Sequence, residues 1–501
     1  MQVRRRAEPP TVTYWQYVAL VRKWDRNALI EGAGWASASN AGKVIVDGEA
    51  STLLPWNVAG MAVTAICRGT RFGIKPTEED VVRLCWMFGN IFDGIADDET
   101  DPTRMLSRLF HEQLPYQHDL LHEWSRAQAL LVDTDFPAHY SPEIMTDGWI
   151  EVLLDGVTVP EYSGTGFVLW ASAQSTNGLY NPDVWDDSMD GLLAVLSKER
   201  IQEIGLKHFV TDIDGIKAIR KAVPSKSLVT EQFAFNPLQT RPFLSDMLPG
   251  TWLAPSTDLL AQKLGVQGIV YSGIDRWGGA FTRDLGHLFQ AYIGDHLRLI
   301  GGARVFEEAK YGPKKNRLDS CDWFVVLDGL VVYIEVKASS PTMEIRESVE
   351  NAFRGVAAKL TKAVVQVNES FAGVQRGEDD LSMIPADLPA VALVVTLDSY
   401  PSAELAFAMG ALGETALPVA FLSAGDLESL VAHDSAEVEA LLFAGMKAAR
   451  GNGIIEYQTV RTAMTRNINP IVDRAWSANP VLRYINDKQA QLTAATPKRS
   501  L

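Results

Sequence analysis

Two strongly apolar runs separated by Asp328-Gly329 constrain the fold of this 501-residue chain more than any other feature. The first run, 323–327, is Trp-Phe-Val-Val-Leu, and the second, 330–334, is Leu-Val-Val-Tyr-Ile. An Asp-Gly pair between β-rich segments is among the strongest short-range signals for a hairpin with a two-residue turn. Because neither run alternates apolar with polar residues, the predicted hairpin is buried and belongs in the middle of a sheet.

A two-residue turn also fixes which residues of the two strands face each other. Counting outward from Leu327 opposite Leu330 places Asp322 opposite Glu335. Opposed residues in an antiparallel pair project from the same face, with Cβ atoms about 5 Å apart. Lys337 lies two residues beyond Glu335 and therefore shares that face. The hairpin is thus predicted to present two carboxylates and one ammonium group together.

This grouping favours a metal site. Two carboxylates about 5 Å apart repel each other by about 3 kcal/mol at an effective dielectric constant of about 20. Lys337 relieves part of that repulsion, and a divalent cation relieves more, since hard carboxylate oxygens suit Mg²⁺ or Mn²⁺. A neighbouring lysine can then stabilise charge on a scissile phosphate or orient the attacking water. The alternative is an ordinary exposed hairpin face with a cross-strand ion pair, but here the charges lie at the rim of a predicted core.

The chain around the hairpin divides into regions of different character. Residues 1–265 have mostly helical spacing, and a Pro/Gly/Thr-rich passage near their end indicates a domain junction. Residues 270–480 open with a helix expected to start at Thr282 and then alternate strands with helices, which predicts an α/β unit. The polar residues 487–501 predict a flexible tail. The expected fold class is an α-helical N-terminal domain followed by an α/β core whose mixed central sheet is flanked by helices.

Asp322 together with Glu335-Val336-Lys337 resembles the motif of the PD-(D/E)XK nuclease superfamily. The predicted order of helix, strand, hairpin, helix, strand and helix over about residues 275–435 is also similar to that family. The resemblance implies a restriction-endonuclease-like core that hydrolyses phosphodiester bonds with Mg²⁺ or Mn²⁺. It implies that Asp322, Glu335 and the carbonyl group of Val336 bind the metal, and that Lys337 assists catalysis. Cys321 stands where many members have proline.

Two helices complete the site that this resemblance implies. Gln290 lies where many members carry a glutamate on the helix before the core strands, and since Gln is a poor cation ligand, the number of metal ions stays open. After the hairpin, Lys362 and Gln366 are four residues apart and share a helix face. They resemble the basic-plus-glutamine helix that lines the site in related nucleases. The alternative for this pair is a solvated helix face.

A basic run immediately before the hairpin is a candidate for nucleic-acid contact. Its cations could bind backbone phosphates, and a solvated loop is the alternative. The run consists of Lys310, Lys314, Lys315 and Arg317.

Composition excludes several other classes of protein. Three scattered cysteines without a C-x-x-C pair indicate reduced thiols in the cytoplasm, and neither a secretory signal nor a long apolar run points to a membrane. No motif of a P-loop NTPase, a G-x-S-x-G hydrolase or a dinucleotide-binding fold occurs. The net charge of -16 is unfavourable for nucleic-acid binding, so such a function requires a local basic patch.

The first hypothesis is therefore a Mg²⁺-dependent nuclease. DNA is the expected substrate, because the resembling superfamily mostly cuts DNA, and microbial antiviral defence or DNA processing is the expected setting. The helical N-terminal part would recognise a protein partner, a DNA feature or a trigger, and homo-oligomerisation is left open. The second hypothesis is a catalytically inactive scaffold that keeps the nuclease fold for binding. A third places the function in the Trp-rich N-terminal region, as a sensor or a partner-binding domain.

Overall fold

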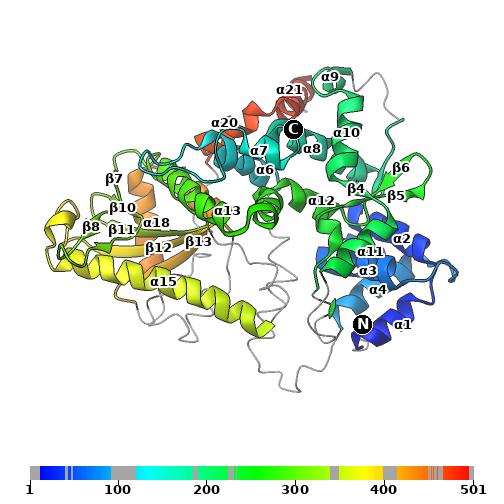
Figure 1. Cartoon of the computed structure of the whole chain (residues 1–501), viewed down its shortest axis with the longest axis horizontal. Coiled ribbons are helices and arrows are strands. Elements are labelled where there is room, and N and C mark those ends of the chain that lie inside the picture. The colour runs from blue at the N-terminus through cyan, green and yellow to red at the C-terminus, as the bar shows by residue number, and fades with distance from the viewer. Residues whose placement is uncertain are drawn as a thin grey trace, which may run out of the picture.

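The structure is a computed structural model. It describes residues 12–39, 43–46, 49–91, 120–183, 190–223, 231–232, 234–338, 349–398, 415–449, 453, 455, 460 and 467–495. Helices dominate one end of the molecule, and a mixed sheet with its covering helices forms the other (Figure 1). None of the described helices is long and apolar enough to cross a membrane.

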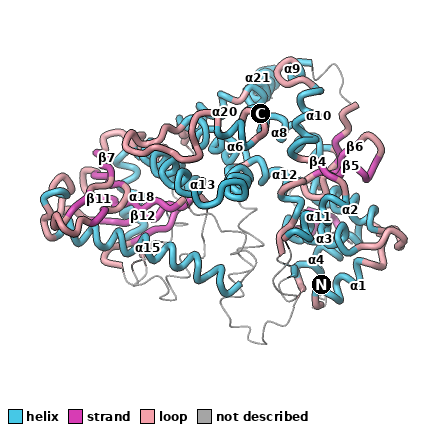
Figure 2. Tube along the Cα trace, in the orientation of Figure 1, coloured by secondary structure: helices cyan, strands magenta, loops and turns pink. Residues whose placement is uncertain are grey.

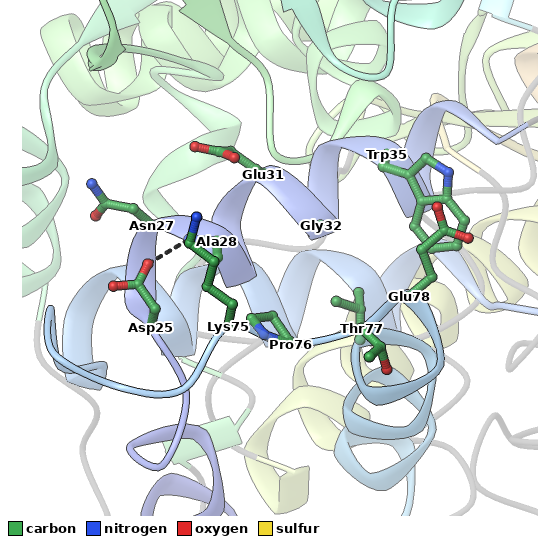
Figure 3. Close-up of a pocket in the computed structure, with 11 residues that line it drawn as sticks. Asp25, Asn27, Ala28, Glu31, Gly32, Trp35, Lys75, Pro76, Thr77 and Glu78 are labelled. Carbon is green, nitrogen blue, oxygen red and sulfur yellow. Dashed lines mark hydrogen bonds between the residues drawn. The ribbon is translucent and has the colours of Figure 1, made fainter.

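The N-terminal helices pack around their own hydrophobic cluster, which also takes in residues between Ile213 and Leu259. Helix α4 begins with a capping box, in which the Thr77 hydroxyl accepts the Asp80 N–H and the Asp80 carboxylate accepts the Thr77 N–H. A pocket lies between α2 and the start of α4 (Figure 3). The elements are α1 (Tyr14–Val21), α2 (Arg26–Ala38), β1 (Lys43–Val46), β2 (Glu49–Thr52), α3 (Pro55–Arg68) and α4 (Glu78–Gly89).

The middle of the chain is less purely helical than the sequence predicts. Short strands far apart in the sequence form a second sheet, in the order β3-β6-β5-β4, beside these helices (Figure 2). The helices are α6 (Leu120–Gln128), the π-helical η3 (Ala129–Asp133), α7 (Trp149–Leu153), α8 (Val159–Ser175), α9 (Asp190–Leu193), α10 (Lys198–His208), α11 (Ile213–Ala222), the 3₁₀ turn η6 (Pro237–Gln239) and α12 (Thr257–Leu264). The strands are β3 (Leu179–Tyr180), β4 (Val210–Thr211), β5 (Phe243–Leu248) and β6 (Thr251–Leu253).

The C-terminal half contains the expected mixed sheet with covering helices. Its order is β13-β12-β11-β10-β7, with β10 antiparallel to β7 and β11, and β11, β12 and β13 mutually parallel. The strands of this sheet are β7 (Arg304–Glu307), β10 (Trp323–Val326), β11 (Val331–Lys337), β12 (Ala390–Thr396) and β13 (Val419–Ser423). A separate two-stranded sheet consists of β8 (Lys310–Tyr311) and β9 (Leu318–Asp319). The helices are α13 (Val266–Leu297), α15 (Val349–Gln375), the 3₁₀ turn η7 (Asp379–Leu381), α17 (Ala424–Leu430), α18 (Ser435–Ala448), α20 (Pro470–Ala478) and α21 (Pro480–Ala495).

Two boundaries differ from the predicted ones. Helix α13 begins at Val266 and is interrupted at Gly278, whose φ of 58° is outside the helical region. Its second segment follows Gly278 and therefore starts a few residues before the predicted Thr282. Of residues 487–501, predicted as a flexible tail, those up to Ala495 belong to α21, and the rest lie outside the described residues.

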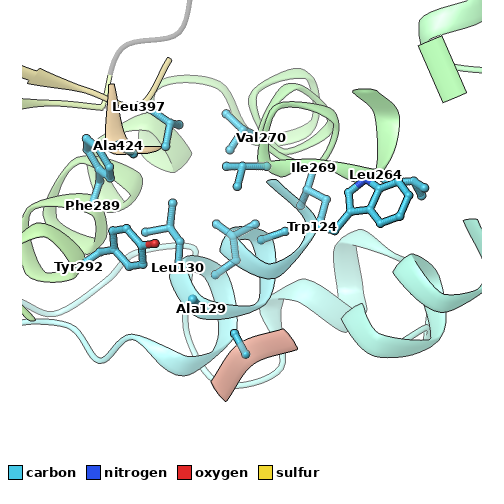
Figure 4. Close-up of a cluster of buried hydrophobic side chains, with 14 of the residues drawn as sticks. Trp124, Ala129, Leu130, Leu264, Ile269, Val270, Phe289, Tyr292, Leu397 and Ala424 are labelled. Atoms are coloured by element: carbon cyan, nitrogen blue, oxygen red, sulfur yellow. The ribbon is translucent and has the colours of Figure 1, made fainter. Parts of the chain in front are cut away.

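One hydrophobic cluster runs through both halves of the molecule. It joins Trp124 and Leu130 of the middle helices to Phe289 of α13 and Leu397 at the end of β12 (Figure 4). The proposed junction between residues 265 and 270 is therefore crossed by shared packing, although the domain division itself stays a prediction.

A buried ion pair fastens α6 to α17 inside this cluster. The Arg126 guanidinium donates to both carboxylate oxygens of Glu428, Nε to Oε1 at 2.5 Å and Nη2 to Oε2 at 2.7 Å. Tyr292 of α13 donates its hydroxyl to Oε1 at 2.7 Å, and Glu428 has no exposed surface. Burial alone would raise the pKa of Glu428, but the positive charge of Arg126 outweighs this effect and holds the pKa well below its usual range. The pair thus ties the middle helices to the segment that follows β13.

Arg126→Met should lower the free energy of unfolding by about 3–5 kcal/mol, because it leaves the Glu428 carboxylate buried without its principal partner. Chemical denaturation followed by circular dichroism measures this change. Arg283→Met is the matched control, since Arg283 pairs with Glu143 at an exposed site, and its effect should stay within about 1 kcal/mol. Equal effects of the two substitutions would contradict the structural role of the buried pair.

Candidate active site

The hairpin has the register that the sequence predicts. Trp323 pairs with Ile334 and Val326 with Val331, and Leu327 donates its N–H to the Leu330 carbonyl at 2.9 Å. Asp322 therefore lies opposite Glu335, one position beyond the last pair of the ladder. Its Oδ2 accepts the N–H of Val336 at 2.6 Å, which fixes the carboxylate against β11.

Glu335 is the most constrained residue of the site. It has no exposed surface, and its Oε1 receives the Lys337 ammonium group. Its Oε2 is also buried and has no hydrogen-bond partner. Burial and then the neighbouring Asp322 raise the pKa of the Glu335 carboxyl, and Lys337 offsets only part of this effect. A buried carboxylate oxygen without a partner is costly, so this position favours either a proton or an additional cation.

Asp322 and Lys337 complete the predicted trio. Burial raises the pKa of Asp322, whereas the Val336 N–H and the Lys337 ammonium lower it. The Lys337 side chain is 29% exposed, so its charge lies between the carboxylates and solvent. The ammonium group can therefore contact both Glu335 and a ligand outside the protein.

Helix α15 covers the face of the sheet that carries this trio. Tyr333, two residues before Glu335 on the same face, packs with Leu360 and Val364 of α15. Gln366 donates its amide to the Ser320 carbonyl at 2.8 Å, which fixes α15 to the segment just before Asp322. Lys362, one turn earlier, is exposed on the same helix. Gln366 thus holds α15 in place, and the predicted catalytic roles of Gln366 and Lys362 stay predictions.

Gln290 approaches from the opposite face. Helix α13 packs in the cluster that contains Val325 and Val336, whose side chains point away from α15. The Gln290 carbonyl accepts the indole N–H of Trp323 at 3.1 Å, so Gln290 lies beside the residue that follows Asp322. This contact locates its backbone, and the catalytic role of its side chain stays a prediction.

The predicted basic run folds as the small β8–β9 hairpin. Two of its cations have carboxylate partners, Lys310 with Asp319 at 3.3 Å and Arg317 with Asp380 at 3.2 Å. Lys314 and Lys315 are exposed at the tip between the two strands. If Lys310 and Arg317 bound phosphates, they would have to give up these ion pairs. Lys314 and Lys315 form no ion pair with the described residues, so they could bind a phosphate without breaking one.

Sequence reasoning missed a third carboxylate. Strand β7 pairs with β10 so that Glu307 faces Trp323, and the next residue, Glu308, continues toward Asp322. Partial removal from water and then the charge of Asp322 raise the pKa of Glu308 to about 7. Asp322 is therefore flanked by two acidic residues, Glu335 on β11 and Glu308 directly after β7.

The residues present suit a hard divalent cation with a largely aqueous shell. Among the described residues, no three His, Cys, Asp or Glu side chains group closely enough to hold a metal ion by themselves. Asp322 and the unpartnered oxygen of Glu335 nevertheless offer two carboxylate ligands, and Mg²⁺ commonly takes one or two carboxylates and keeps several waters. The coordination by the Val336 carbonyl stays a prediction.

Comparisons with family models, curated proteins and solved structures found no match to this chain. Its function is therefore argued from the geometry of the site.

Mg²⁺ or Mn²⁺ should stabilise the protein more strongly as the pH rises from about 5 to about 9, because Glu335 must lose its proton before it binds a cation. The raised pKa means that the folded chain holds this proton more tightly than the unfolded chain. Without metal, stability should therefore fall as the pH rises through the folded-state pKa. Thermal unfolding with and without metal measures both trends.

Glu335→Gln should weaken both pH trends, the growing stabilisation by metal and the loss of stability without metal, because Gln has no proton to lose. Glu307→Gln, which neutralises an exposed carboxylate on β7, is the matched control and should leave them intact. A metal-induced shift that is independent of pH would contradict the assignment of Glu335 as a ligand.

Proposed function

We propose that this chain is a Mg²⁺-dependent nuclease with a restriction-endonuclease-like core in its C-terminal half. The observation that carries the proposal is the buried, unpartnered Oε2 of Glu335 beside Asp322 and Lys337. A structural ion pair requires one carboxylate for the ammonium group, whereas this hairpin buries a second one at an electrostatic cost. A phosphodiesterase site has a use for all three groups.

Each residue of the trio has a distinct role in this proposal. Asp322 and Glu335 hold the cation, with Asp322 fixed by the Val336 N–H. The partly exposed Lys337 side chain places its ammonium group to stabilise negative charge on the scissile phosphate or to orient the attacking water. When bound, the cation would lower the pKa of that water and neutralise developing charge. Gln366 holds α15 against the segment that leads into Asp322.

The order of secondary-structure elements supports the same proposal. Helix α13 precedes β7, the β10–β11 hairpin follows, and α15 crosses over to the parallel strand β12. This is the order that the resemblance implies, with the trio at the end of the hairpin. DNA is the proposed substrate, in microbial defence or DNA processing, and the helical half would recognise the target or a partner.

Purified protein should nick supercoiled plasmid with Mg²⁺ or Mn²⁺ and not with EDTA, and Lys337→Ala should reduce the rate by at least about 100-fold. Agarose gel electrophoresis of timed samples measures the rate. Lys447→Ala, which removes an exposed lysine on α18, is the matched control and should cut normally. Cutting that survives Lys337→Ala would contradict the assigned site.

A catalytically inactive scaffold is the second candidate, favoured by Gln290 in place of a carboxylate and by the net charge of -16. Metal binding separates the two candidates before activity is considered. The enzyme proposal expects a Mn²⁺-induced rise in melting temperature that Asp322→Ala abolishes. Absence of any metal effect in the wild-type chain would favour the scaffold.

A further inference from the structure

The loop between α3 and α4 presents an apolar tip to solvent. Phe72 is 96% exposed and Ile74 is 70% exposed. Large apolar side chains of this kind are more stable buried than in water. Two such side chains on one loop make it a candidate contact surface.

The loop is rigidly built. Residues 70 and 74 bond to the start of α2, with Asp25 donating to the Ile74 carbonyl and Arg26 to the Thr70 carbonyl, each at 2.8 Å. Gly73 lies so close to Trp24 that a Cβ atom would be 2.0 Å from the Trp24 carbonyl carbon. Backbone that is held this tightly presents Phe72 without a large ordering cost on binding.

Positive charge surrounds this tip. Arg71 and Lys75 flank it in the loop, and Arg22 and Lys23 lie beside it, because their carbonyls accept the Thr70 hydroxyl at 2.9 Å and the Ile74 N–H at 3.1 Å. All four cations are exposed, and none has an ion pair among the described residues. We define the Phe72 surface as Arg22, Lys23, Arg71, Phe72, Ile74 and Lys75.

We propose that the Phe72 surface binds single-stranded nucleic acid, with its cations on backbone phosphates and Phe72 stacked on an unpaired base. Exposed aromatic rings within basic surfaces are the usual means of binding single strands. This inference deepens the proposed function, since it assigns a nucleic-acid contact to the helical half, at the other end of the molecule from the C-terminal sheet (Figure 1). It also supplies the local basic patch that a chain of net charge -16 requires.

The adjoining pocket sets one boundary of this surface. Lys75 lines this pocket as well, together with the carboxylates of Asp25, Glu31 and Glu78 (Figure 3). Carboxylates repel phosphates but accept hydrogen bonds from amino groups of bases. The backbone of a bound strand should therefore follow the cations of the Phe72 surface and avoid the pocket.

Binding of a fluorescent single-stranded DNA of about 20 nucleotides, measured by anisotropy with the full chain in EDTA, tests the proposal without cleavage. Phe72→Ala should weaken binding by about 5- to 150-fold, and Phe72→Trp should restore it. Arg71→Ala and Lys75→Ala should each lower the slope of log affinity against log salt by about 0.7. Melting temperatures should not change, because these side chains are exposed.

The controls remove the same groups elsewhere on the surface. Leu206→Ala deletes an exposed apolar side chain on α10, and Lys447→Ala deletes one positive charge on α18; both should bind as the wild type does. Unchanged affinity in Phe72→Ala and Arg71→Ala would overturn the proposal. Equal affinity for poly-glutamate of similar charge would also overturn it and assign the surface to acidic protein segments.

The outcome is independent of the nuclease assay. Lys337→Ala should bind the oligonucleotide normally, since Lys337 lies on β11 and outside the Phe72 surface. Loss of binding in Phe72→Ala without metal-dependent cutting by the wild type would support this surface and refute the nuclease. Lys337-dependent cutting together with normal binding by Phe72→Ala would support the nuclease and refute the Phe72 surface.

Discussion

The pairing register between β10 and β11 is the constraint on which the candidate site depends. A shift by one residue would turn Glu335 and Lys337 from the α15 face to the α13 face and place Val336 in their position. Both faces are buried, so such a shift would bury charge in the apolar cluster under α13. The closing turn adds a tertiary contact, since Glu439 of α18 accepts the Gly329 N–H at 2.9 Å. Local turn chemistry and the packing of both faces therefore favour the same arrangement.

This agreement explains why part of the site could be predicted from sequence and part could not. A two-residue turn determines the pairing of Asp322 with Glu335 without information from the rest of the chain. Glu308 lies close to Asp322 through β7, but the segment between them contains the β8–β9 hairpin, and no short turn fixes that pairing. The same reasoning applies to the second sheet, where β3 and β4 have two residues each and leave no alternating pattern to detect. Pairings made by distant segments need the tertiary structure.

The Arg126–Glu428 ion pair links α6 of the middle region to α17 of the C-terminal half. Glu428 belongs to α17, which begins at Ala424 directly after β13. Tyr292, which also contacts Glu428, belongs to α13, the helix that covers the hairpin. The middle helices and the candidate core therefore share charged contacts as well as the apolar cluster of Figure 4. Ion pairs of this kind contribute little net stability but penalise any arrangement that separates the partners. A ligand that moved α6 would have to move α17 as well or break the pair.

The large negative charge of the chain is compatible with nucleic-acid binding because charge acts locally in salt solution. At physiological ionic strength the Debye length is about 8 Å. The repulsion between a phosphate and an exposed carboxylate that lies farther away than this is largely screened. The four exposed cations around Phe72 lie within one loop and the adjoining turn, and only Lys75 among them also lines the pocket that contains the carboxylates. The remaining negative surface then disfavours other approaches of a polyanion. Net charge therefore restricts where a strand binds more than whether it binds.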